Sequence, residues 1–337
     1  MRFLPTPPAT ALKRALLLGV TGVSLYLLAP SLLAVFSSAD RLDQVRPLWF
    51  VPMVALEAAS LISMALLQRL CLGPGALVPV LWSQLAGNAF ARVVPGGGAA
   101  GAALQYSMLV EAGEAGGRAA TALTAANLLT FATLLALPAL TLPAILAGLP
   151  VDPGLAEAAL LGFGGFVVMA AAGAALLALD GPLVFVGRTV QRLRNRVLRR
   201  RGSLVDLPER LLEERDLILR TVGARWWEAL LASLARWLLD YGVLLTALAA
   251  VGATPSPSLV LLAYAASQTL AQIPVTPGGL GFVEAGLLGL LALAGVSGGR
   301  AALATLAYRL VSFWLPLPVG GVAIAVHRRR EARGASR

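Results

Sequence analysis

Six ionisable side chains lie inside otherwise apolar stretches of this chain. They are Glu57, Arg92, Arg236, Asp240, Glu284 and Arg309. A charged group at the centre of a membrane helix costs about 2.5–3.5 kcal/mol on insertion scales, so each of them needs a partner or a water-filled cavity. The chemistry open to such groups is ion pairing and the binding of a charged ligand. Arg236 and Asp240 stand four residues apart on one helix face, where they can neutralise each other, and we favour a structural role for that pair.

The other charges lie near two Pro-Gly-Gly turns that interrupt the apolar sequence. Arg92 lies three residues before Pro95, Glu284 lies seven after Pro277, and Arg309 falls in the next apolar stretch. For these three charges we favour a functional role, whereas Glu57 fits either role equally. Polar side chains gather in the same regions. The candidate site is Arg92, Pro95, Gly96, Gly97, Pro277, Gly278, Gly279, Glu284, Arg309, Tyr308, Gln268, Gln272 and Asn88.

Sequence patterns of catalysis are missing. The chain has no G-x-x-x-x-G-K-[ST], H-E-x-x-H, C-x-x-C or G-x-S-x-G, and it has one cysteine, Cys71, and one histidine, His327. An intramembrane enzyme is disfavoured because no nucleophile–base pair is recognisable. We therefore expect no enzyme activity, no catalytic residue, no cofactor and no metal site.

Composition indicates an all-α polytopic integral membrane protein. Hydrophobic residues make up 58% of the chain and charged residues 13%, against about 45–50% and 25% in soluble domains. About six apolar stretches are long enough for full transmembrane helices, which need about 20 residues. They lie near 15–36, 48–67, 119–147, 155–179, 226–251 and 301–326. The net charge of +10 is concentrated near the ends of these stretches, so it does not indicate a nucleic-acid partner.

Regions 76–112 and 258–296 differ from these spans. Each contains two shorter apolar stretches that meet at a Pro-Gly-Gly turn, and Ala99–Glu111 would make a helix of only about 20 Å at 1.5 Å per residue. We interpret both regions as re-entrant hairpins, although full crossings, giving 8–10 membrane segments, fit the charges equally well. If the second hairpin folds back against the following span, Glu284 and Arg309 can meet near the membrane centre.

The two hairpins belong to an internal repeat. Pro-Gly-Gly, Ala-Gly and Gly-Gly-Arg-Ala-Ala recur in one register, which pairs Pro95 with Pro277 and Arg118 with Arg300, 182 residues apart. Three long spans and one hairpin separate Arg118 from Arg300, so the copies face opposite sides of the membrane. We therefore predict two inverted repeats whose turns approach each other at the midplane.

The predicted organisation is a single transmembrane domain over residues 1–337. Its parts are the first repeat at 15–147, the second repeat at 155–179 plus 226–326, a basic linker at 180–225 and a basic tail at 327–337. The linker holds eleven arginines, which place it in the cytoplasm together with both termini. We expect two amphipathic surface helices in the linker, the second starting at Asp206 with a capping box to Glu209. A mechanical joint between the halves is favoured there over specific lipid sensing.

The residues around the turns also carry a family resemblance. The segments Pro277-Gly-Gly-Leu-Gly-Phe-Val-Glu284, Tyr308-Arg309-Leu and Arg92-Val-Val-Pro-Gly-Gly-Gly resemble the lysylphosphatidylglycerol synthase transmembrane-region family. This is the flippase-like domain of the multiple peptide resistance factor and of stand-alone bacterial and archaeal proteins. The resemblance covers roughly residues 10–326 and is weaker in the first half, where Asn127 replaces part of an acidic–basic pair that is common in the family. We expect the aminoacyltransferase domain to be absent, which leaves transport alone.

The resemblance implies a flippase that moves a phospholipid, an aminoacylated lipid or an isoprenoid or glycosylated lipid between leaflets. An anionic headgroup would contact Arg92, Arg309 and the backbone amides of the turns, because helix N-termini favour anions. The alternative is a non-transporting accessory protein that binds lipid or a lipid-biosynthetic enzyme through the basic linker. Either protein would lie in the cytoplasmic (inner) membrane of a bacterium or archaeon, with membrane lipids as its partners.

Overall fold

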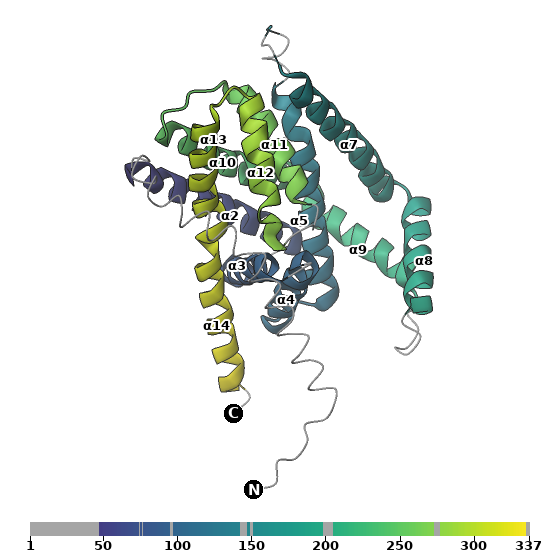
Figure 1. Cartoon of the computed structure of the whole chain (residues 1–337). Coiled ribbons are helices and arrows are strands. Elements are labelled where there is room, and N and C mark those ends of the chain that lie inside the picture. The colour runs from purple at the N-terminus through teal and green to yellow at the C-terminus, as the bar shows by residue number, and fades with distance from the viewer. Residues whose placement is uncertain are drawn as a thin grey trace, which may run out of the picture.

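A computed structural model of the chain describes residues 47–73, 75, 77–94, 97–141, 147–148, 151–197, 205–272 and 277–334. The regular structure of these residues is helical (Figure 1). Among them, four stretches are long and apolar enough to cross a membrane, and they are Pro47–Leu72, Gly116–Thr141, Trp226–Ala250 and Gly298–Arg329. A fifth is present if a bent pair of helices, Phe163–Ala178 and Asp180–Arg196, counts as one span. The all-α polytopic architecture is confirmed, and the stretch expected at 15–36 lies outside the described residues.

The predicted spans correspond to individual helices. They are α2 (Phe50–Leu72), α5 (Gly116–Ala136) with the short helix η3 (Leu137–Thr141), α7 (Pro153–Ala178), α10 (Trp226–Ala250) and α13 (Gly298–Arg309). After Arg309 the chain passes through a π segment, η6 (Leu310–Trp314), into α14 (Pro316–Gly334). The last predicted span is therefore one helix with an irregular turn in its middle.

The two hairpin regions consist of short helices. The first pairs α3 (Leu77–Val93) with α4 (Gly97–Glu111), and the second pairs α11 (Pro257–Ala271) with α12 (Phe282–Leu293) across the short helix η5 (Pro277–Gly279). The longest, α3, has 17 residues, which gives about 26 Å of helix against a hydrocarbon core of about 30 Å. Figure 1 shows α3 and α4 towards the bottom of the bundle and α11 and α12 towards the top. This arrangement agrees with hairpins that enter from opposite sides.

Equivalent helices make equivalent contacts in the two halves. α2 packs on α5 as α10 packs on α13, and α4 packs on α5 as α12 packs on α13. The most extensive helix pair is α2 with α10, which joins the halves. Ser60 of α2 bonds to Arg236 of α10, while Met53, nearer the start of α2, shares a core cluster with Val243, further along α10. The two helices are therefore antiparallel, as corresponding helices of inverted repeats must be.

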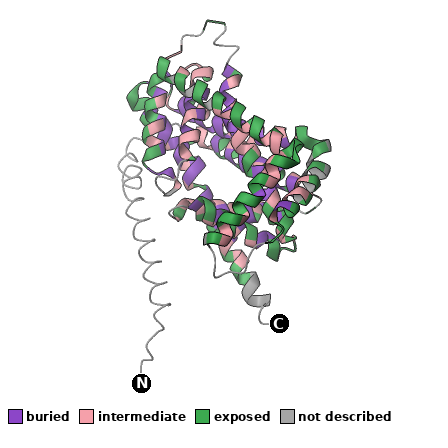
Figure 2. Ribbon diagram, turned by 90° about the vertical axis from the view of Figure 1, so that its right-hand side faces the viewer, coloured by how far each residue is buried: buried purple, intermediate pink, exposed green. Residues whose placement is uncertain are grey.

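Buried residues gather where the helices face one another (Figure 2), and many large apolar side chains are exposed on the outward surfaces. On α7, for example, Leu160, Leu161 and Val168 are all largely exposed. A water-soluble protein seldom exposes so much contiguous apolar surface, whereas lipid covers it in a membrane. The outward faces thus agree with a polytopic membrane protein.

The linker forms two helices, as predicted. α8 (Asp180–Val197) turns 98° away from α7 and packs against α9 (Leu207–Val222). Arg215 bonds to Asp180 and Asp216, and these hydrogen bonds raise the pKa of Arg215. The pair α8–α9 is held together by charges as well as by apolar contact.

The predicted capping box at the start of α9 is wrong. Asp206 has a left-handed backbone (φ 62°), and its side chain makes no cap hydrogen bond. A capping residue needs an extended backbone to aim its carboxylate at the first helical amides. Gln191 of α8 instead accepts a hydrogen bond from the Leu207 amide through Oε1 (3.1 Å). The first turn of α9 is therefore capped from the neighbouring helix.

Candidate functional site

The second turn is built from glycines in conformations that other residues avoid. Gly278, Gly279 and Gly281 have φ values of 60°, 70° and 78°, in the left-handed region that a side chain disfavours. Gly281 is the N-cap residue of α12, and Glu284 lies in the first turn of that helix. A helix N-terminus favours a carboxylate. The break in the hairpin therefore places Glu284 where its charge is stabilised.

The predicted meeting of Glu284 and Arg309 is present in the structure. Arg309 Nε donates to Glu284 Oε1 over 2.7 Å, and Arg309 Nη2 donates to the Gly278 carbonyl oxygen over 3.3 Å. Arg309 is 9% exposed. The second carboxylate oxygen, Glu284 Oε2, is buried and has no hydrogen-bond partner in the described part of the chain. The charged pair thus keeps one acceptor position unused.

Arg92 donates hydrogen bonds to backbone carbonyls in a segment where a proline removes an amide donor. In a regular helix the Ser312 carbonyl would accept from the amide of residue 316, but that residue is proline and has no N–H. Arg92 Nη1 supplies the missing donor, at 2.9 Å from the Ser312 oxygen and 2.5 Å from the Phe313 oxygen. Arg92 Nε also donates to Asn88 Oδ1 over 2.9 Å. The arginine at the end of α3 therefore holds the π segment of the opposite repeat.

The end of α3 and the second turn meet around Phe313. The guanidinium groups of Arg92 and Arg309 lie 5.0 and 4.3 Å from the centre of its ring. A Cβ atom added to Gly278 would lie 2.6 Å from that ring and 3.1 Å from the Arg92 carbonyl oxygen. The end of α3, which leads into the first turn, therefore lies against η5, while the approach of the two Pro-Gly-Gly tips themselves stays a prediction. Gly97 is buried at the start of α4, while Pro95 and Gly96 lie outside the described residues.

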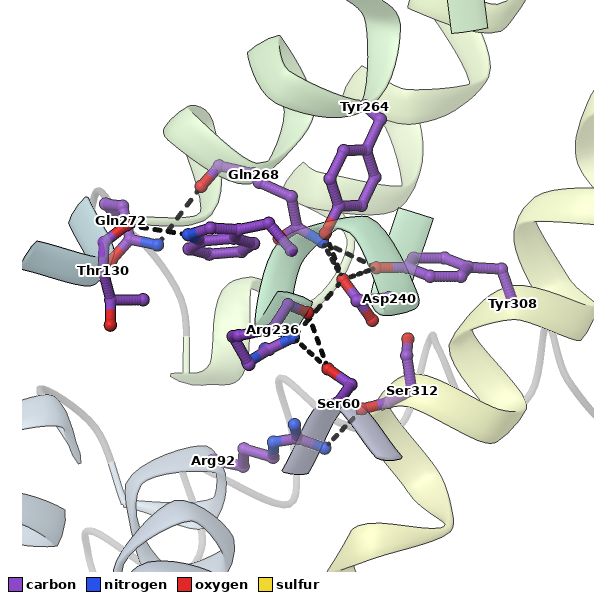
Figure 3. A network of polar contacts seen from close by, with 11 residues as sticks. Ser60, Arg92, Thr130, Arg236, Asp240, Tyr264, Gln268, Gln272, Tyr308 and Ser312 are labelled. Atoms are coloured by element: carbon purple, nitrogen blue, oxygen red, sulfur yellow. Dashed lines mark hydrogen bonds and ion pairs between the residues drawn. The ribbon is translucent and has the colours of Figure 1, made fainter. Parts of the chain in front are cut away.

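A second polar cluster surrounds Asp240 (Figure 3). Its Oδ2 atom accepts hydrogen bonds from Tyr264 (2.5 Å), Tyr308 (2.9 Å) and Gln268 (3.0 Å). Gln268 also donates to the Tyr308 hydroxyl over 2.6 Å. Two of the predicted site residues, Gln268 and Tyr308, therefore converge on a carboxylate that the sequence placed in a different pair.

The predicted mutual neutralisation of Arg236 and Asp240 is loose. Arg236 Nη1 lies 3.9 Å from Asp240 Oδ2, while it donates to Ser60 Oγ over 2.7 Å and stacks on Trp237 at 4.9 Å. The three neutral donors around Asp240 make shorter contacts than the arginine does. Asp240 is thus the centre of a network that joins α10, α11 and α13, with Arg236 at its edge.

Other predicted residues lie at the margin. Gln272 is exposed, and its amide donates to the Gln268 carbonyl oxygen over 3.3 Å. Asn127, which matches Arg309 in the repeat register, is also exposed. Sequence reasoning missed Ser60 and Tyr264. The spacings Glu57–Ser60 and Tyr264–Gln268 put each pair on one helix face, and this was the signal available for them.

Two hollows in the described part of the chain lie away from the turns. One, of about 670 Å³, lies between α2 and α10 and is lined by Leu66, Arg69, Arg225, Trp227 and Leu231 among others. The other, of about 170 Å³, is lined by residues of α3, α4 and α14, including Trp82 and His327. Neither is lined by described residues of the turns.

Comparison with known proteins identifies a family for the chain. A family model described as the lysylphosphatidylglycerol synthase TM region matches residues 15–320. The chain is 39% identical over 70 residues to a UPF0104 membrane protein of Pyrococcus horikoshii, and 32% identical over 91 residues to one of Methanothermobacter thermautotrophicus. These alignments cover 21% and 27% of the chain, and they span 21% and 26% of the two relatives. No solved structure matches the chain.

Proposed function

The chain belongs to the family of the lysylphosphatidylglycerol synthase transmembrane region, and from that premise we propose that it moves a lipid with an anionic headgroup between leaflets. It is a multi-pass membrane protein. In this proposal it acts as a transporter without catalytic chemistry, and membrane lipids are its substrates. The candidate lipids are phospholipids, aminoacylated phospholipids and isoprenoid or glycosylated lipids.

The observation that carries the proposal is the Glu284–Arg309 pair at the broken turn. A buried ion pair is a poor source of stability, because desolvation offsets most of the attraction. A headgroup phosphate is a strong competitor for Arg309, since an arginine fork binds phosphate as well as it binds carboxylate. The amides at the start of α12 would then stabilise the phosphate, because helix N-termini bind anions. In the structure, the Glu284 carboxylate takes the place on Arg309 that the phosphate would take in this proposal.

The contact between the two turns suggests how the site opens. Arg92 and Phe313 join α3 to the π segment, and Gly278 packs against both of them. A lipid headgroup crossing between the leaflets would have to separate these groups, which frees Arg92 to act as a second cation for the phosphate. The acyl chains would remain outside, against apolar side chains of α12 such as Phe282, Leu288 and Leu293, which are exposed. In this mechanism Arg309 binds the phosphate, and release of Arg92 from the π segment opens the site.

The test is transfer of a fluorescent phospholipid in liposomes that contain the purified full chain. We expect Glu284→Gln and Arg309→Gln to reach the membrane and to lose transfer of an anionic phospholipid. The matched control is Glu228→Gln, which removes an equivalent carboxylate from an ion pair with Arg225 at the start of α10. Full transfer by both site variants would remove Glu284 and Arg309 from the mechanism.

We place the protein in the cytoplasmic membrane of a bacterium or archaeon with both termini and the α8–α9 linker inside the cell. The arginine content of the linker supports this orientation. Cysteines introduced at Ser203 and Ser336 should resist a membrane-impermeant thiol reagent in intact cells. Labelling from outside would reverse the orientation.

A second candidate function is that of an accessory protein which binds lipid or a lipid-biosynthetic enzyme. The observation in its favour is the basic pair α8–α9, which leaves Phe185 and Leu193 exposed beside the arginines. Such a surface suits an anionic leaflet or an acidic partner. An accessory protein would leave lipid transfer in liposomes at the rate of protein-free controls.

A further inference from the structure

One buried carboxyl group has no role in the transport site described above. Glu57 of α2 is 2% exposed, as is Asp240 of α10. The two carboxyl groups lie close together, because Ser60 of α2 bonds to the Arg236 carbonyl and Leu56 lies against Gly242 of α10. Glu57 Oε2 has no hydrogen-bond partner in the described part of the chain. Such an unpartnered buried polar atom is rare in folded proteins and requires a physical reason.

The groups around the two carboxyls come from five helices. α2 contributes Glu57 itself, α10 contributes Arg236 and Asp240, α3 contributes Arg92, α11 contributes Tyr264 and α13 contributes Tyr308. Neither arginine forms a close ion pair with Glu57, because Arg236 bonds to Ser60 and Arg92 bonds to the carbonyls of Ser312 and Phe313. Both guanidinium groups therefore already donate hydrogen bonds to other acceptors.

Two carboxyl groups in contact repel each other strongly when both are ionised in a low-dielectric interior. A shared proton removes that repulsion and supplies an O–H donor between them. Of the two groups, Asp240 is the one whose ionised form is better stabilised, because its Oδ2 accepts three hydrogen bonds. The proton therefore belongs on Glu57, which has no comparable set of donors.

We propose that Glu57 and Asp240 form a proton-binding site that takes up and releases one proton in each transport cycle. In the loaded state Glu57 carries the proton as an O–H bond. On release that bond breaks, the proton passes to water on one side of the membrane, and Glu57 becomes a carboxylate. A proton from water on the other side restores the O–H bond. This inference rests on the proposed lipid transport and identifies its driving force as a proton gradient.

The structure offers a link from this site to the gate. An ionised Glu57 would attract Arg92, which lies within electrostatic range of it, away from the Ser312 and Phe313 carbonyls that hold the two turns together. Tyr308 adds a second link, because it donates to Asp240 and immediately precedes Arg309 on α13. A polar face of α11 leads from Asp240 through Gln268 to the exposed Gln272. Water reaching Gln272 would approach the carboxyl pair along that face.

The first test uses the full chain in liposomes with a one-unit pH difference across the membrane and a fluorescent anionic phospholipid. With one proton per lipid, the phospholipid should accumulate about tenfold in one leaflet. Glu57→Gln should still equilibrate the lipid but should not accumulate it. Glu228→Gln, the matched carboxyl-to-amide control, should accumulate it as the unmodified chain does. Equilibration without accumulation by the unmodified chain would overturn the proton-binding site and leave lipid transport standing.

The second test does not depend on transport. Infrared difference spectra of the full chain in lipid should show the carbonyl band of a protonated carboxyl group at neutral pH, lost at alkaline pH and in Glu57→Gln but kept in Glu228→Gln. Absence of that band from the unmodified chain would overturn the inference, even if no lipid were moved. Accumulation that follows a sodium gradient instead of the pH difference would also overturn it.

Discussion

In the α3–α4 hairpin the two arms press their backbones together, whereas the α11–α12 hairpin is opened at its turn by left-handed glycines and holds a charged pair. A Cβ atom on Gly87 would lie 2.7 Å from the Gly101 carbonyl oxygen, so the first hairpin tolerates little change. The second hairpin places Glu284 opposite Arg309. Its glycines at 286 and 289 have more space around them. We therefore propose that the two copies of one sequence pattern serve as a rigid support and as a binding site.

The support role of the first hairpin predicts the largest effect. Gly101→Leu would push a side chain into the backbone of α3 at Gly87 and should lower the free energy of unfolding by about 3 kcal/mol. Gly98→Leu in the same helix is the control, because a Cβ atom there meets nothing within 4 Å. Thermal unfolding in detergent measures both variants. Equal stability of the two would mean that the close approach of the arms is unimportant.

Arg92 should behave as part of that support. Arg92→Gln leaves the Ser312 carbonyl without its donor, and the free energy of unfolding should fall by about 2 kcal/mol. Arg309 and Glu284 remain in contact, so the preference for anionic over zwitterionic phospholipid should weaken but persist in the transfer assay, because Arg92 is only the second cation for the phosphate. Complete loss of that preference with unchanged stability would make Arg92 the main binding residue and would weaken the contrast between the hairpins.

The binding role of the second hairpin predicts the opposite pattern for a milder change. Arg309→Lys keeps the positive charge but loses the planar fork and part of the stacking on Phe313, so transfer of an anionic phospholipid should slow by about tenfold. Melting temperature should change little, since the ion pair contributes little stability. If melting fell while transfer stayed normal, Arg309 would be structural.

The smallest expected effect tests whether the missing amide of Pro316 is the reason why Arg92 bonds to the Ser312 carbonyl. Pro316→Ala returns an amide donor to the Ser312 carbonyl, so Arg92→Gln should cost about 1 kcal/mol less in that background. Four proteins, namely the unmodified chain, the two single variants and the double variant, give this coupling from their unfolding free energies. Additive effects would show that Pro316 does not create the need for Arg92.

The sequence was sufficient for interactions that follow from spacing alone. The meeting of Glu284 and Arg309 could be predicted because a hairpin that folds back onto the next span leaves those two charges few other partners. The role of Arg92 could not, since it depends on an irregular turn and on a carbonyl, 220 residues away, that lacks its amide donor. The same limit applies to Asp240. Its neighbour Arg236 is visible from helical spacing, but Tyr264 and Tyr308 arrive from helices whose packing the sequence does not specify.

The π segment after Arg309 has a consequence for how the two halves are compared. A π turn accommodates one residue more than an α turn, so every side chain beyond Trp314 is rotated by about 100° relative to an unbroken helix. An ungapped alignment of α5 on α13–α14 would therefore match helix faces as far as Asn127 and Arg309. Beyond these residues it would pair side chains that lie on different faces. A single-residue gap placed within 310–314 restores the match. The structural symmetry of the halves would then extend further along α14 than an ungapped alignment suggests.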